Sequence, residues 1–141
     1  MTEVIKRDGN KEALNIEKLH KVVSFACENV AGVSASQVEL NSKIQFFDGI
    51  KTEDVQETLI KSAADLISEE TPNYQWVAGR LINYHLRKMV YGQFDPPHLH
   101  GIVVKNVERG FYDAEILSSF SKSEFNKLNS YIKHQRDDNL T

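Results

Sequence analysis

Basic side chains gather at two places in this chain, and both places could bind an anion. At the first, Lys6 and Arg7 precede an Asp8-Gly9 pair, and Lys18 follows. An Asp-Gly pair is a strong hairpin signal, because glycine tolerates positive φ. Lys18 falls in the first turn of a helix expected after Asn15, where the helix dipole favours an anion over a base. A phosphate bound there would explain the lysine; a lysine that extends into solvent is the alternative.

The second basic place lies on a helix expected over residues 74–91. Between residues 71 and 94 there is no acidic residue, whereas three bases are present, which are Arg80, Arg87 and Lys88. Tyr84 and His85 stand four and three residues before Lys88, so on a helix the three side chains share a face. An aromatic ring beside two cationic groups suits a base or sugar next to phosphates. A packing tyrosine with solvated bases is the alternative.

The composition bounds the class of protein. The 141 residues include 17 Lys and Arg against 20 Asp and Glu, which gives a net charge of −3, and 40% are hydrophobic. These values are typical of one globular domain, or of one domain with a small appendage. Two local basic zones in an acidic chain favour a specific anion pocket over a broad nucleic-acid surface. No apolar run approaches the roughly 20 residues of a membrane span. The single cysteine favours a cytoplasmic protein.

Catalytic and metal-binding patterns are missing from the sequence. The lone Cys27 excludes an internal disulfide, a cysteine zinc ribbon and a dithiol pair, and we expect it to be a small buried hydrophobe. No Walker loop, G-x-S-x-G or H-E-x-x-H motif is present. His98 and His100 have no third ligand nearby, so we expect no metal site. The residues alone indicate a phosphate pocket and no catalytic residues.

Hydrophobic periodicity and capping signals predict a small sheet laid on about four helices. Residues 4–14 read as a hairpin, and residues 49–51 are a short link or one further strand. The long helices are expected at about 15–30, from 34 to about 44 or 46, at 52–67 and at 74–91, and the first three open on the N-caps Asn15, Ser34 and Thr52.

Asp95-Pro96-Pro97 is the best boundary, because each proline disfavours helix in the residue before it. Three short helical patterns follow: one closes at Gly110, one is capped by Asp113, and one opens on a capping box of Ser121 and Glu124. Such a segment is too short to hold a core alone, so it must dock on another part.

Long strings of the sequence carry a family resemblance. VIKRDGNKEALNIEKLHKVV, SQVEL, IQFFDGIKTEDVQETLIKSAADLIS and PNYQWVAGRLINYHLRKMVYGQFDPP stand in this order between residues 4 and 97. In this register they resemble the N-terminus of the large subunit of class I ribonucleotide reductase, the aerobic ribonucleoside-diphosphate reductase. The resemblance implies a mainly α (α+β) fold. Residues 1–95 would be an ATP-cone, a four-helix bundle capped by a small three-stranded β-sheet, and residues 96–141 a helical segment leading into a catalytic barrel.

The resemblance also implies an allosteric site that binds ATP as activator or dATP as inhibitor, with Mg²⁺. The implied contacts are Lys6, Arg7, His85 and Lys88 for the phosphates, Glu12, Leu14, Asn15 and Ile16 for or around the adenine, Lys18 and Thr52 for phosphate and sugar, and Val55 and Tyr84 as walls. The chain departs from the family pattern at two positions. Gln56 stands where relatives carry histidine, and Tyr84 where they carry phenylalanine.

Ribonucleotide reduction needs at least three cysteines, so we expect this chain to be an inactive N-terminal piece of a split or truncated subunit. The implied partners are the barrel-containing remainder of the large subunit and the radical-generating small subunit, in an oligomer, with no nucleic acid and no membrane. The alternative is a degenerate cone that acts only as a subunit-interaction module. An ATP-cone transcriptional regulator is less favoured, because residues 1–5 leave no room for its zinc ribbon.

Overall fold

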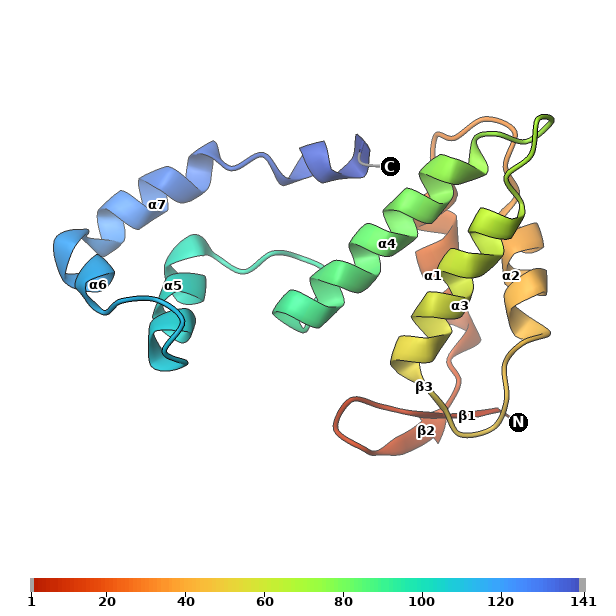
Figure 1. The fold of residues 1–141 in the computed structure, drawn as a ribbon, viewed down its shortest axis with the longest axis horizontal. Coiled ribbons are helices and arrows are strands. Elements are labelled where there is room, and N and C mark those ends of the chain that lie inside the picture. The colour runs from red at the N-terminus through yellow and green to blue at the C-terminus, as the bar shows by residue number, and fades with distance from the viewer. Residues whose placement is uncertain (1, 140–141) are drawn as a thin grey trace. The chain divides into compact units, whose positions relative to one another are not determined.

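The computed structural model describes residues 2–139 as a small sheet and a series of helices (Figure 1). The described chain forms two compact units, one reaching to Leu86 and including residues 137–139, the other Arg87–Arg136. This division falls inside a helix, ahead of the boundary expected at residue 95. The assignment of residues 1–95 and 96–141 to two domains stays a prediction. None of the helices within the described residues is long and apolar enough to cross a membrane.

The sheet has three strands in the order β2-β1-β3. β1 (Glu3–Ile5) pairs antiparallel with β2 (Lys11–Ala13), which confirms the predicted hairpin. Gly9 in the turn has a φ of 85°, in the region that favours glycine. β3 (Ile50–Lys51) lies parallel to β1, so the link at residues 49–51 is a strand.

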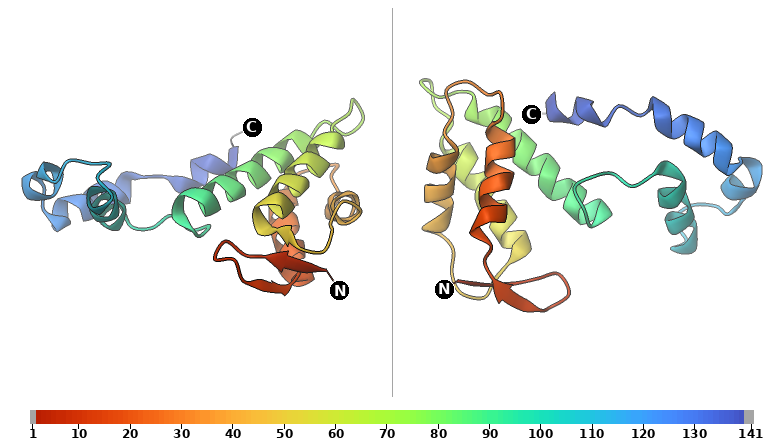
Figure 2. Two further views of the ribbon diagram at one scale, coloured as in Figure 1. Left: turned by 60° about the horizontal axis from the view of Figure 1, so that its bottom comes forward. Right: turned by 180° about the vertical axis from the view of Figure 1, so that it is seen from behind.

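Four helices form the bundle, with the sheet at one end of it (Figure 1; Figure 2). They are α1 (Ile16–Cys27), α2 (Ala35–Lys43), α3 (Thr52–Asp65) and α4 (Tyr74–Tyr91). Each contributes apolar side chains at helical spacing to one core, including Leu19, Val23, Val38, Val55, Leu59, Val77 and Leu81. The mainly helical fold with a small capping sheet is therefore confirmed.

Capping residues set the starts of α1 and α2 as predicted, but not the start of α3. Asn15 and Ser34 cap α1 and α2, since their side chains accept the backbone N–H groups of Lys18 and Gln37. The prediction that Thr52 caps α3 is wrong. β3 runs directly into the helix, so Lys51 occupies the cap position and Thr52 is already helical.

Three helices end one to three residues before the predicted positions. α1 ends at Cys27 because the next residue, Glu28, has an extended backbone with a ψ of 128°, and Asn29 after it has a left-handed φ of 59°. α2 ends at Lys43 and α3 at Asp65. The apolar residues beyond α3 therefore cover less core than expected, and Ile67 is 45% exposed.

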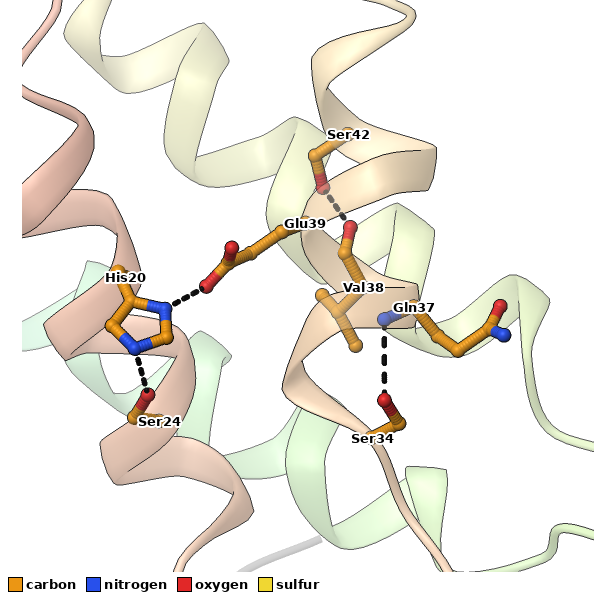
Figure 3. A network of polar contacts seen from close by, with 7 residues as sticks. All are labelled: His20, Ser24, Ser34, Gln37, Val38, Glu39 and Ser42. Carbon is orange, nitrogen blue, oxygen red and sulfur yellow. Dashed lines mark hydrogen bonds and ion pairs between the residues drawn. The ribbon is translucent and has the colours of Figure 1, made fainter.

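Polar contacts fix α1 against its neighbours (Figure 3). His20 Nδ1 on α1 lies 2.6 Å from Glu39 Oε1 on α2, while Ser24 Oγ lies 3.4 Å from His20 Nε2. The buried Ser42 hydroxyl is satisfied because it donates to the Val38 carbonyl. At the other end, the Arg80 guanidinium on α4 donates to the carbonyls of Ala26 and Glu28 and closes the C-terminus of α1.

The second unit contains α5 (Leu99–Glu108), α6 (Glu115–Ser119) and α7 (Lys122–Tyr131), and η1 (His134–Asn139) begins in it. The predicted capping box is confirmed, since Ser121 and Glu124 each accept the other's backbone N–H. Ala114, not Asp113, precedes α6, although Asp113 still accepts the Glu115 N–H through its side chain. Few apolar side chains are fully buried here, among them Val103 and Phe125.

Candidate functional site

The hairpin turn and the start of α3 border a hollow of about 270 Å³. Two segments line it, contributing Ile5, Lys6, Arg7, Gly9, Lys51, Thr52 and Glu53. The parallel pairing of β1 with β3 is what positions them, because it sets Ile5 opposite Lys51. Of the predicted site residues, Lys6, Arg7 and Thr52 are thereby brought together.

The side chains around the hollow are mainly cationic. Three bases and one acid line it, which gives 3 − 1 = +2. Lys6 Nζ lies 3.0 Å from Glu12 Oε1, and Arg7 Nε lies 3.9 Å from Glu53 Oε1. Both pairs are partly exposed, and such ion pairs contribute only about 0–1 kcal/mol. A polyanion can therefore replace these carboxylates at small cost.

The start of α3 adds backbone donors to this charge. Lys51 at the cap position makes no side-chain capping hydrogen bond. The first N–H groups of a helix have no partner within the helix, and an anion is a good acceptor for them. The hollow thus combines side-chain cations with the N-terminus of a helix of 14 residues.

The residues predicted around an adenine run from β2 to the start of α1, and they lie outside the lining of the hollow. Glu12 reaches its edge through the ion pair with Lys6. Leu14 packs on the core, whereas Ile16 is 55% exposed. The Asn15 side chain caps the helix, and Lys18, whose N–H it accepts, is exposed.

Several buried polar side-chain atoms on α3 and α4 have no hydrogen-bond partner within residues 2–139. Among them are Oε1 of Gln56, Oγ of Ser62 and Nδ1 of His85. Gln56 follows Thr52 by one helical turn, so the two side chains share a face of α3. Val55 lies beside them in the core, with 5% of its surface exposed. Buried polar groups are normally paired, so each of these atoms calls for a partner.

The remaining predicted residues lie along the second half of α4. Tyr84 and His85 are half-buried, and burial raises the pKa of the Tyr84 hydroxyl. Lys88 lies in the last turn of the helix, within the second unit. Its contact with a phosphate stays a prediction.

Sequence reasoning missed Lys51 and Glu53 as members of the site. Lys51 belongs to residues 49–51, which the sequence predicts only as a short link or one further strand. The pairing of residues 49–51 with β1 is the signal that could have found them. It places Lys51 opposite Ile5, the residue before Lys6, and so beside the hollow.

Cysteine and histidine outside the hollow have local roles. Cys27 is half-buried at the edge of the core, not buried as predicted, because α1 ends there. Burial raises the pKa of its thiol, against an opposing effect of Arg80. His98 accepts the N–H of His100 at the start of α5. No cluster of three or more potential metal ligands occurs within residues 2–139.

Comparison with known proteins identifies the family. Residues 2–89 match the ATP cone domain. The chain belongs to the ATP-cone family. It is 53% identical over 134 residues to the ribonucleoside-diphosphate reductase 1 subunit alpha of Escherichia coli K12, covering 95% of this chain and 18% of that protein. It is 41% identical over 143 residues to the ribonucleoside-diphosphate reductase subunit alpha of Enterobacteria phage T4. That match covers 100% of this chain and 19% of the phage protein.

These matches confirm the resemblance seen in the sequence, which lies in the N-terminal region of the alpha subunit. A third relative, the subunit alpha of Haemophilus influenzae, is 48% identical over 134 residues. This ATP-cone chain spans about a fifth of the length of these relatives.

Proposed function

We propose that this chain is the allosteric activity module of a ribonucleoside-diphosphate reductase alpha subunit, and that it binds ATP as activator and dATP as inhibitor. The observation that carries the proposal is the cationic hollow at the start of α3. It lies inside the segment that matches the ATP cone, and it gathers Lys6, Arg7 and Thr52 from two distant parts of the chain.

The triphosphate occupies the hollow. Lys6 and Arg7 leave their weak carboxylate partners and make charge-assisted hydrogen bonds to phosphate oxygens. The N–H groups at the start of α3 donate to the same anion. His85, Lys18 and Lys88 supply further contacts to it, and Mg²⁺ is held on the phosphate oxygens.

The nucleoside extends from the hollow toward the start of α1. Glu12 and Asn15 hydrogen-bond the adenine, while Leu14 and Ile16 flank it. Val55 and Tyr84 form the walls. The ion pair of Lys6 with Glu12 supports this placement, because it brings the adenine side and the phosphate side of the site together at the hairpin.

The ligand is bound and not hydrolysed. The sequence has no Walker loop, and its lone cysteine, Cys27, cannot perform ribonucleotide reduction. The reaction therefore belongs to partners, which are the barrel-containing remainder of the large subunit and the radical-generating small subunit, within an oligomer. The relatives support this assignment, since this chain covers about 18% of the E. coli protein.

A thermal-shift titration with ATP, dATP and adenosine tests the proposal. Ligand that binds only the folded chain stabilises it by RT ln(1 + [L]/Kd), about 2.7 kcal/mol at a hundredfold excess over Kd. We expect both triphosphates, with Mg²⁺, to raise Tm more than adenosine does, and their concentration to stay constant over time. If neither nucleotide shifts Tm at saturating concentration, the proposal is wrong. GTP is the matched control for the base.

A further inference from the structure

We propose that Glu53 ligates the Mg²⁺ ion of a bound nucleoside triphosphate, and that it thereby makes the hollow selective for the magnesium complex over the free triphosphate. The inference rests on the proposed function and deepens it. It names the form of the nucleotide that the site takes and the residue that selects this form.

The first observation is an acid in a site for anions. Glu53 is the one acidic side chain among the described residues that line the hollow, where Lys6, Arg7 and Lys51 are the bases. Its carboxylate repels the phosphates that these bases attract. Its ion pair with Arg7 is loose, with 3.9 Å between Arg7 Nε and Glu53 Oε1, and the Glu53 side chain is 54% exposed. Such a pair adds little to the stability of the fold, so stability does not explain the acid.

The second observation is the difference between the two acids in the first turn of α3. Asp54 is exposed and lies outside the described lining of the hollow, whereas Glu53 belongs to that lining. The helix dipole favours a carboxylate at either position. Asp54 provides this benefit without opposing the ligand, so the dipole alone does not account for an acid at Glu53 either.

The oxygen groups at the start of α3 fit magnesium. In nucleotide sites Mg²⁺ is bound by one or two carboxylates together with phosphate oxygens and water. Glu53 supplies the carboxylate, and the adjacent Thr52, which also lines the hollow, supplies a hydroxyl. No histidine or cysteine is among the described lining residues, and a site for a hard cation needs none.

The charge of the hollow explains why the cation matters. The lining side chains sum to +2, which is less than the negative charge of a free triphosphate. With a divalent cation on the phosphates, two charges of the ligand are cancelled and its contact with Glu53 changes from repulsion to attraction. Lys6 and Arg7 then bind the remaining phosphate oxygens, as in the proposed function.

The test measures by calorimetry the affinity of the full chain for ATP in excess Mg²⁺ and in EDTA, at matched ionic strength, and takes the ratio of the two affinities. We expect Glu53→Gln to bind free ATP more tightly than the original chain, because a repelling charge is gone. The ratio should fall about tenfold, the effect of a carboxylate beside a divalent cation at a solvated surface. Glu53→Ala, which removes the carboxylate without adding an amide, should give the same fall.

Asp54→Asn is the matched control, because it removes the neighbouring charge from the same helical turn and leaves the lining unchanged. Its ratio should equal that of the original chain. An equal fall in Asp54→Asn and Glu53→Gln would assign the effect to the general field of α3 and overturn the inference.

The inference is also overturned if the ratio stays unchanged in both Glu53 variants, since Glu53 would then only compete with the nucleotide for Arg7. Either result leaves the proposed binding of nucleotide intact. Failure of the original chain to bind ATP in both conditions would overturn the inference and the proposed function together.

Discussion

At the scale of one residue, the ion pair of Lys6 positions its ammonium group beside the hollow while leaving it available to a ligand. Its ion pair with Glu12 has a short distance of 3.0 Å, yet both side chains are more than one-third exposed. Solvent screens such a pair, so the lysine is positioned near the hollow without being strongly bound to its partner. A triphosphate offers several charges where Glu12 offers one.

We therefore expect Lys6→Ala and Lys88→Ala to weaken triphosphate binding by roughly 1.5–3 kcal/mol each, the value of a charge-assisted hydrogen bond. Adenosine, which has no phosphate, should bind these variants nearly as it binds the original chain. Calorimetry with ATP and adenosine measures both losses. Lys61→Ala is the control, because Lys61 is exposed on α3 and lies outside the hollow. Equal losses for the two ligands would show that the lysines act through folding.

Also at the scale of one residue, Tyr84 makes the free energy of unfolding depend on pH. Burial raises the pKa of its hydroxyl above the ordinary value of 10.0. As the pH rises through that value, the unfolded chain releases the proton before the folded chain does. The contribution is fully present below pH 10 and is lost as the pH passes through the raised folded value, so the free energy of unfolding falls there.

Between neutral pH and about pH 10.5, close above the ordinary tyrosine pKa, the free energy of unfolding should fall less in the Tyr84→Phe variant than in the original chain. Urea denaturation at several pH values measures the difference. Tyr131→Phe provides the control, since that tyrosine is exposed in the second unit. Parallel curves for the original chain and Tyr84→Phe would contradict the prediction.

At the scale of the element, Asn15 has one observed role and one proposed role. Its side chain caps α1 by accepting the Lys18 N–H at 3.1 Å, and we propose that it also hydrogen-bonds the adenine. Loss of an asparagine cap costs about 1 kcal/mol, whereas aspartate caps a helix as well as asparagine does. The two tasks can therefore be separated by substitution.

We expect Asn15→Ala to lower the free energy of unfolding by about 1 kcal/mol and Asn15→Asp to leave it nearly unchanged. Both should weaken ATP binding, because neither keeps the amide that can both donate to and accept from the base. Chemical denaturation and calorimetry on the same samples measure the two effects. If Asn15→Asp binds ATP as the original chain does, Asn15 is only a cap.

Elements encoded by local signals could be predicted from the sequence. The Asp8-Gly9 turn gave the hairpin, and the last long helix was predicted with its observed bounds, Tyr74–Tyr91. The capping box of Ser121 and Glu124 was also predicted, because both of its partners lie within one helical turn. In these cases the residues that decide the structure are neighbours in the chain.

The predictions that were wrong or incomplete concern features that depend on contacts between residues distant in the sequence. Thr52 has the side chain of an N-cap, but the pairing of β3 with β1 starts the helix one residue earlier. The same pairing carries Lys51 to the hollow, across 46 residues from its partner Ile5. No local pattern encodes that register. The local basic cluster indicated Lys6 and Arg7 and the family resemblance added Thr52 to the site, while the unpaired carbonyl of Gln56 is visible only in the structure.

At the scale of the whole molecule, the two units differ in how well they bury apolar side chains. The first unit has a continuous core to which all four long helices contribute. The second unit leaves large apolar side chains exposed, among them Phe111, Tyr112, Phe120, Leu128, Tyr131 and Ile132. Exposed apolar surface of this extent favours association with another protein surface.

This exposed set of side chains favours a role in subunit contacts alongside the proposed nucleotide binding. Phe111 and Tyr131 are the most exposed of these side chains, at 73% and 67%. The relatives are about five times longer than this chain, so they have further sequence that could cover such side chains. We propose that the remainder of the large subunit is what covers them.

We expect the isolated chain to self-associate as its concentration rises, because the exposed apolar side chains of the second unit find one another when that partner is absent. Sedimentation velocity over a range of concentrations measures this. The double substitution Phe111→Ser with Tyr131→Ser should reduce the association. Ile44→Ser, which changes an exposed apolar residue of the first unit, should not.

The remainder of a related alpha subunit, added in excess, should bind the chain and protect residues 99–131 from limited proteolysis, since segments without a docking partner are cut first. A chain that stays monomeric, resists cleavage in that segment and does not bind the remainder would rule out the subunit-contact role and leave a self-sufficient nucleotide-binding domain.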